Sequence, residues 1–149
     1  MYCGIDPGLK GGIALIKDKE IICHSKMLPD YQFIKYIQEL IKQYKNITFV
    51  IEKVSAMPGQ GVSSMFKFGY NTGYLYGVLH TLQQRVIEVT PRVWKQYFKI
   101  PGKKKGQESK DLTALAVRQF YPEMIDVKFH DGIYDAILIA KYQIEKDKK

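Results

Sequence analysis

Four acidic side chains stand where apolar stretches of the sequence begin or end. Asp6 closes an apolar run near the start of the chain, Glu52 closes a β-branched run, and Asp135 opens the apolar part of the last predicted helix. A carboxylate at the edge of a buried segment is costly unless a cation meets it. Asp131 precedes Asp135 by four residues, so on a helix the two lie on one face, one turn apart.

These side chains offer only oxygen ligands, which suit Mg²⁺ or Mn²⁺ rather than zinc. Two such ions about 3.5–4 Å apart can activate a water molecule and stabilise the leaving oxygen when a phosphodiester is hydrolysed. The ions also reverse the repulsion between the acids and the phosphate. The set predicts a two-metal-ion phosphodiester hydrolase whose catalytic residues and metal ligands are Asp6, Glu52, Asp131 and Asp135.

Structural roles remain open for the same residues and for the histidine beside them. Asp6 precedes a Pro-Gly turn and can bond its own backbone there. Glu52 can pair with Lys53 or face water. Asp131 can be a helix N-cap, and His130 can either cap the same helix or orient water and bind a metal.

The charge balance favours a polyanionic partner. The 149 residues hold 23 lysines and arginines against 15 acids, a net charge of +8 with a pI near 9.3. Such an excess suits nucleic acid, although lysine-rich loops are often only solvated. The side chains expected to contact phosphates without reading sequence are Lys95, Lys103, Lys104, Lys105 and Lys110.

Three aromatic residues follow a predicted loop that begins after Glu52. Phe66, Phe68 and Tyr70 lie at the start of a long predicted helix, where an aromatic ring can stack on an unpaired base. Packing in the core is the alternative, and we expect it for at least one of the three.

The length fits one domain, 1–149, with a sizeable core. No apolar run approaches the length that crosses a bilayer, and the start lacks the features of a signal peptide. Two cysteines, Cys3 and Cys23, make neither a disulfide framework nor a metal cluster. We therefore expect an intracellular, cytoplasmic protein that acts with DNA, without membrane contact or a small-molecule cofactor.

The patterning of apolar residues supplies the elements that must position these side chains. Strands are predicted over 3–6, 13–16, 20–27, 47–51 and 85–89, and helices over 29–46, from 63 past Gly77, from Pro91, over 109–120 and over 130–145. Their order predicts an α/β fold with a mixed five-stranded sheet flanked by helices, in which the first three strands form an antiparallel meander.

Glycines recur every four residues in the long helix, at Gly69, Gly73 and Gly77, and therefore share one face. Each lowers helix propensity by about 1 kcal/mol, so a compensating close approach is expected. Either the domain's own sheet or a second subunit can provide it.

Several of these motifs together resemble those of RuvC-type Holliday junction resolvases. The resemblance rests on Gly4-Ile5-Asp6-Pro7-Gly8 with Gly12-Ile13-Ala14, on Val50-Ile51-Glu52, and on Asp131-Gly132-Ile133-Tyr134-Asp135-Ala136. The segments 66–69, 90–95 and 120–122 are similar to the compact members of phages and of the chloroplast branch. The last two acids are four residues apart, as in that branch, whereas the best-known bacterial members have them three apart.

The resemblance implies an RNase H-like fold, a homodimer, and Mg²⁺-dependent paired nicking of four-way DNA junctions with two ions in each site. It carries catalysis onto the four acids named above. It also implies that the loop from Met57 to Phe68, including Gln60 and Phe66, probes the junction centre.

Other functions stay open at this point. An RNase H-like nuclease can act on other branched DNA or on RNA–DNA hybrids, and a protein of this charge can bind junctions without cutting them. The four acids count against the second alternative, because a pure DNA binder gains nothing from carboxylates beside phosphates. ATPases of the actin and sugar-kinase type also begin with a strand, an aspartate and a glycine turn, but need two such domains.

Overall fold

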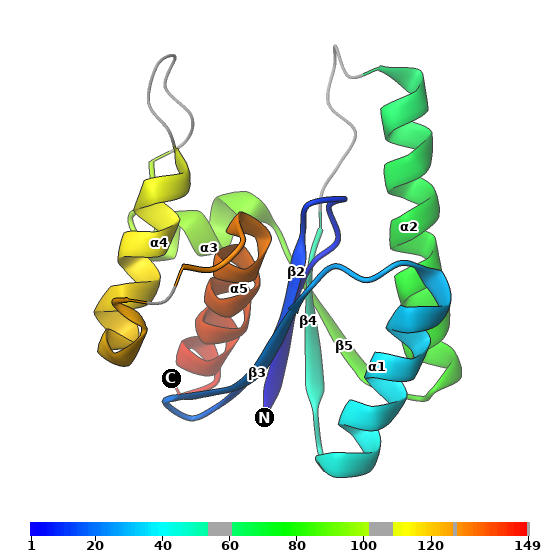
Figure 1. The fold of residues 1–149 in the computed structure, drawn as a ribbon, viewed down its shortest axis with the longest axis horizontal. Coiled ribbons are helices and arrows are strands. Elements are labelled where there is room, and N and C mark those ends of the chain that lie inside the picture. The colour runs from blue at the N-terminus through cyan, green and yellow to red at the C-terminus, as the bar shows by residue number, and fades with distance from the viewer. Residues whose placement is uncertain (54–60, 102–108, 127, 149) are drawn as a thin grey trace.

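A mixed five-stranded sheet forms the middle of the molecule (Figure 1). The computed structural model describes residues 1–53, 61–101, 109–126 and 128–148, with the backbone alone for 109–111. The strand order is β3-β2-β1-β4-β5, antiparallel from β3 to β1 and parallel from β1 to β5. The predicted sheet and its meander are therefore confirmed. The strands are β1 (Tyr2–Asp6), β2 (Gly12–Lys17), β3 (Glu20–Lys26), β4 (Thr48–Glu52) and β5 (Arg85–Val89).

Helices cover both faces of this sheet, α1 and α2 on one side and α3, α4 and α5 on the other (Figure 1). Their bounds are α1 (Asp30–Gln43), α2 (Val62–Thr81), α3 (Pro91–Tyr97), α4 (Ser109–Phe120) and α5 (Asp131–Asp147), with a short 3-10 helix at Pro122–Met124. None of the helices in the described ranges is long and apolar enough to span a bilayer. Cys3 and Cys23 are free thiols in β1 and β3.

Successive side chains of a strand point to opposite faces of its sheet, and the core follows this rule. Phe49 and Ile51 pack with Ile5 against α1 and α2, whereas Val50 packs against the helices of the other side. Gly4, Asp6 and Glu52 follow the parity of Val50 and therefore point to the side of α3 and α5.

Helix α5 lies unusually close to the sheet because glycines remove side chains between them. A Cβ atom on Gly4 would overlap the Ala136 carbonyl, and one on Gly12 would come within 2.6 Å of the Gly132 carbonyl group. Gly11 and Gly132 form a parallel bridge at this contact. The N-terminus of α5 is thereby fixed beside the turn that follows β1.

The glycine face of α2 does not serve the close packing on the sheet that we considered. Among the described residues no atom lies within 4 Å of an ideal Cβ on Gly69, Gly73 or Gly77. The buried residues of α2 are instead Leu75 and Leu79. That alternative is therefore wrong for these glycines, and approach by a second subunit stays a prediction.

Candidate active site

Asp6 and Glu52 lie at the same edge of the sheet. Strands β1 and β4 are parallel neighbours with Ile5 beside Ile51, and each acid is the next residue of its strand. Their side chains point to the same face, toward α5. The sequence predicted both acids at strand ends, and the parallel register brings them together.

Glu52 is the most deeply buried of the four acids, with 7% of its surface exposed. It accepts a hydrogen bond from the Trp94 indole nitrogen over 2.8 Å. Lys53 does not pair with it but bonds to Glu88 over 2.6 Å. Both ordinary explanations for Glu52, pairing with Lys53 and facing water, are therefore wrong.

The pKa of Glu52 is raised to about 7. Burial is the main cause, and the negative charges of Asp6 and Asp135 add to it. The hydrogen bond from Trp94 and the charge of Lys95 act in the opposite direction. Since these effects act over short distances, they show that acids from β1, β4 and α5 share one region.

The pKa of Asp135 is raised to about 6, chiefly by burial and then by the charge of Asp6. Lys95 and a hydrogen bond to Thr113 oppose this increase, while the Asp131 charge adds to it. The prediction that Asp135 is an acid leading a core-facing helix is confirmed by its position in the first turns of α5. Asp131 is exposed and lies one turn earlier.

Asp6 combines the two roles considered for it. Its Oδ1 accepts a hydrogen bond from the Gly8 N–H over 3.0 Å, so it does close its own turn. Burial nevertheless raises its pKa, against the effects of that hydrogen bond and of the charges of Lys95 and His130. A turn aspartate is thus also a member of the acid cluster, by which we mean Asp6, Glu52 and Asp135.

Lys95 is the cation common to this cluster. It comes from α3, is half-buried, and lowers the pKa of all three acids. Its Nζ lies 5.0 Å from the centre of the Trp94 ring. The sequence predicted Lys95 as a phosphate contact, and the structure places it where a phosphate bound at the acids would need a counter-charge.

His130 occupies the N-cap position of α5, but its side chain makes no capping hydrogen bond. The capping explanation for this side chain is therefore wrong. Its Nδ1 is buried without a hydrogen-bond partner among the described residues. Asp131 is the first residue of the helix rather than its cap, so the N-cap explanation for Asp131 is wrong as well.

The donor chemistry of this region fits a hard divalent cation. Three carboxylates with raised pKa values carry more negative charge than Lys95 balances, and His130, whose charge also acts on Asp6, has an Nδ1 without a partner among the described residues. No three histidine, cysteine, aspartate or glutamate side chains within the described ranges are already arranged as a metal site. Metal binding by the four acids therefore stays a prediction, which the clustering of Asp6, Glu52 and Asp135 supports.

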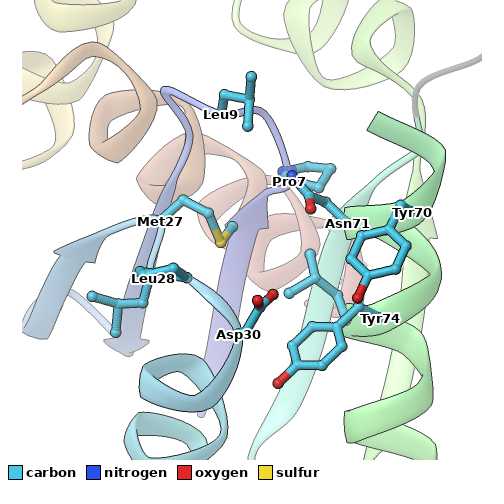
Figure 2. A pocket seen from close by; sticks show the side chains of 10 residues that line it. Pro7, Leu9, Met27, Leu28, Asp30, Tyr70, Asn71 and Tyr74 are labelled. Carbon is cyan, nitrogen blue, oxygen red and sulfur yellow. The ribbon is translucent and has the colours of Figure 1, made fainter. Parts of the chain in front are cut away.

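The aromatic residues at the start of α2 are largely open to solvent. Phe66 is 74% exposed and Tyr70 61% exposed, while Phe68 is half-buried. Phe66 and Tyr70 therefore do not pack in the core formed by the described residues. Tyr70 lines a groove of about 430 Å³ that is also lined by Pro7 and Leu9 of the turn after β1 (Figure 2).

Several predicted DNA contacts fall outside the part of the chain that the structure describes. They are Met57, Gln60, Lys103, Lys104 and Lys105, together with the side chain of Lys110, whose backbone belongs to α4. They stay predictions.

Two residues that hold the cluster were not predicted from the sequence. Trp94 is the single tryptophan of the chain and lies beside Lys95 in the sequence. Because a buried indole N–H needs a hydrogen-bond acceptor, the sequence did contain a signal that could have identified Trp94 as a partner of an acid. Thr113, the partner of Asp135, lies within α4 without any pattern that marks it.

Comparison with known proteins gives matches in structure but not in sequence. No family model matches the chain. No match is found among curated proteins. Two structures of RuvC from Thermus thermophilus match. The one in complex with Holliday junction substrate has a TM-score of 0.72 and 15% identity, and the match covers 99% of this chain and 94% of that one. The other has a TM-score of 0.70 and 16% identity, and the match covers 99% of this chain and 95% of that one.

The fowlpox virus resolvase, described in complex with substrate Holliday junction DNA, matches at TM-score 0.58 and 15% identity over 98% of this chain and 99% of that one. All three likenesses span nearly the whole of both chains. The RNase H-like arrangement expected from the motifs is thus confirmed at the level of the fold: this chain folds like RuvC and like a poxvirus resolvase.

Proposed function

We propose that this protein is a divalent-metal-dependent endonuclease that resolves four-way DNA junctions. The observation that carries the proposal is the cluster of Asp6, Glu52 and Asp135 at one edge of the sheet. The fold supports it, because the RuvC and fowlpox resolvase structures of the same fold are described with Holliday junction DNA. The net charge of +8 suits the same substrate.

In this proposal the neighbours of the acids hold them in place before DNA binds. The Gly8 N–H fixes one oxygen of Asp6, and the Trp94 indole fixes one oxygen of Glu52. Two bound Mg²⁺ or Mn²⁺ ions would supply an activated water and stabilise the leaving oxygen. Asp6, Glu52, Asp131 and Asp135 would hold these ions, and Lys95 would place its positive charge against the scissile phosphate.

Paired nicking of a four-way junction needs two active sites on one substrate. We therefore also propose that the protein acts as a homodimer. A protein that only binds junctions is disfavoured by the acid cluster, since carboxylates repel phosphates unless a cation lies between them.

One cleavage experiment tests the proposed function. The protein is incubated with a labelled four-way junction, a duplex, a flap and an RNA–DNA hybrid, each with and without Mg²⁺. We expect metal-dependent cleavage of the junction in preference to the other three. Preference for the flap or the hybrid would assign another nuclease substrate, and binding without cleavage would leave a junction-binding protein.

A further inference from the structure

A basic groove of about 510 Å³ opens beside the acid cluster, along α3 and the turn that follows it. Its polar lining consists of Arg92, Lys95, Gln96 and Lys99, and no acidic residue lines it among the described residues. We call this surface the α3 groove. Arg92 is followed by Lys95 and Gln96 at spacings of three and four residues, so the three share one side of the helix, and Lys99 lines the groove from the turn after it.

The four residues lead from the surface to the acids. Arg92 and Lys99 are exposed, whereas Lys95 is half-buried at the inner end and lowers the pKa values of Asp6, Glu52 and Asp135. Neither Arg92 nor Lys99 has an acidic partner in the described part of the chain, in contrast to Lys53, which pairs with Glu88. Within the described residues, no acid balances their charge.

We propose that the α3 groove binds the phosphodiester backbone of the DNA strand that enters the acid cluster. This inference rests on the proposed nuclease function and adds Arg92, Gln96 and Lys99 to its DNA contacts. Arg92 lies in the first turn of α3 and Lys99 in the turn that ends it, so the two can contact different phosphates of one strand. Arginine and lysine contacts of this kind position a substrate without reading its sequence.

The backbone at Lys99 permits a variant that removes charge without straining the fold. Lys99 has φ of 56°, a left-handed conformation that glycine adopts more readily. The helix ends there in a Schellman motif, with hydrogen bonds from the Ile100 N–H to the Lys95 carbonyl over 2.8 Å and from the Lys99 N–H to the Gln96 carbonyl over 3.1 Å. Lys99→Gly keeps both hydrogen bonds.

A matched control lies at the end of α2. Gln83 has φ of 54° and closes the same motif, with hydrogen bonds from the Gln83 N–H to the His80 carbonyl and from the Gln84 N–H to the Leu79 carbonyl, each 2.9 Å. It lies just before β5, at the end of the strands opposite to the end that carries Asp6 and Glu52. Gln83→Gly therefore makes the same backbone change away from the groove, and Lys42→Gln on α1 removes an exposed charge elsewhere.

The test measures the binding of labelled junction and plain duplex in EDTA at several salt concentrations. Each phosphate contact contributes about −0.9 to the slope of log K against log salt concentration. We expect Arg92→Gln and Lys99→Gly each to make this slope shallower by about 0.9 for both DNAs, with the Tm of Lys99→Gly not below that of the parent. Gln83→Gly and Lys42→Gln should leave the slope unchanged.

Unchanged slopes for Arg92→Gln and Lys99→Gly would overturn the α3 groove, as would an equal loss in either control. A loss of binding to an acidic polypeptide with an unchanged DNA slope would assign the groove to a protein partner and also overturn it. The proposed nuclease function fails separately. If the two variants show the expected slope changes but the parent protein cuts no junction, the α3 groove stands and the nuclease function is wrong.

Discussion

Glu52 shows how a single side chain can report the state of the acid cluster. Burial, with the charges of Asp6 and Asp135, raises its pKa to about 7, above its value in an unfolded chain. Between about pH 4.5 and pH 7 the folded protein then binds more protons than the unfolded one, so stability falls as pH rises through this window.

We expect the raised pKa of Glu52 to lower the free energy of unfolding in EDTA by about 3–4 kcal/mol over that window, since one pKa unit corresponds to about 1.4 kcal/mol. Saturating Mg²⁺ or Mn²⁺ should restore the loss at pH 7.5, because a cation replaces the protons. Urea denaturation from pH 5 to pH 8 measures both effects. Glu52→Gln should make the curve shallower above about pH 6, while Asp135, whose pKa is raised to about 6, keeps part of the fall below that pH. An equally steep curve above pH 6 in that variant would contradict the assignment to Glu52.

Asp6 can be neutralised with little change to its turn. In Asp6→Asn the side-chain carbonyl can still accept the hydrogen bond from the Gly8 N–H. We expect this variant to retain junction binding and to lose cleavage, because a metal ligand is gone while the phosphate contacts remain. Asp18→Asn, at an exposed turn, is the matched control and should cut normally. Metal-dependent nicking by Asp6→Asn would remove Asp6 from the site.

Phe66 is an exposed ring whose role can be separated from folding. With 74% of its surface exposed, its loss should leave the Tm unchanged. If the ring stacks on a base, Phe66→Ala should weaken junction binding by about 1–3 kcal/mol and slow cleavage at limiting protein. Tyr31→Ala, which removes another exposed ring on α1, should change neither. A lowered Tm for Phe66→Ala would assign the ring to packing instead.

Contacts between single residues were only partly predictable. Asp6 and Glu52 could be placed at strand ends from the apolar pattern, but the parallel pairing of β1 with β4 that brings them together is seen only in the structure. The hydrogen bonds from Trp94 and Thr113 depend on how α3 and α4 pack on the sheet, which no local pattern encodes. For the same reason the sequence left open whether Lys53 pairs with Glu52.

At the scale of elements, the contact between α5 and the turn after β1 decides where two of the four acids lie. A Cβ on Gly132 would overlap backbone atoms of Lys10 and Gly11, and neither backbone can move without the strand or the helix. We expect Gly132→Ala to lower the free energy of unfolding by more than the usual cost of a substitution, about 0.5–3 kcal/mol, with a lower Tm, and to abolish cleavage. Thermal unfolding and the junction assay measure these effects.

Gly69→Ala on α2 makes the same change in a helix with open space around it. It should raise stability by up to about 1 kcal/mol, because alanine is the better helix former. A stable Gly132→Ala protein that still cuts junctions would contradict the role of this contact.

Element bounds were predicted closely where the apolar pattern was strong. The strand at 85–89 and the helix at 109–120 have the predicted limits, whereas α1 ends at Gln43, ahead of the predicted 46. The glycines show where the pattern fails. Gly69, Gly73 and Gly77 looked like a packing face, but the close approach occurs at Gly4, Gly12 and Gly132. Spacing within one helix does not reveal which neighbour approaches it.

At the scale of the whole molecule, the acids lie between two surfaces of different chemistry. Helices α2 and α3 lie on opposite sides of the sheet (Figure 1). Exposed aromatic rings belong to α2, and the basic groove belongs to α3. Unpaired bases suit the first surface and backbone phosphates the second. A branched DNA offers both, which a plain duplex does not.

In the proposed function one molecule supplies one acid cluster and cuts one strand, so resolution would require two copies to act on one junction. We expect sedimentation of the protein at micromolar concentration to give a dimer. A mixture of parent and Asp6→Asn protein tests whether the two sites act within one assembly. On a cruciform plasmid the parent should produce linear DNA, because paired nicks open both strands.

Mixed dimers should instead nick once and leave open circles, so excess Asp6→Asn should convert linear product to open circles in proportion to the mixed-dimer fraction. The same excess of Glu52→Gln should do likewise, since it disables the same site. If parent protein alone accumulates open circles before linear product, each nick is made by an independent monomer, and the homodimer is wrong while the nuclease stands.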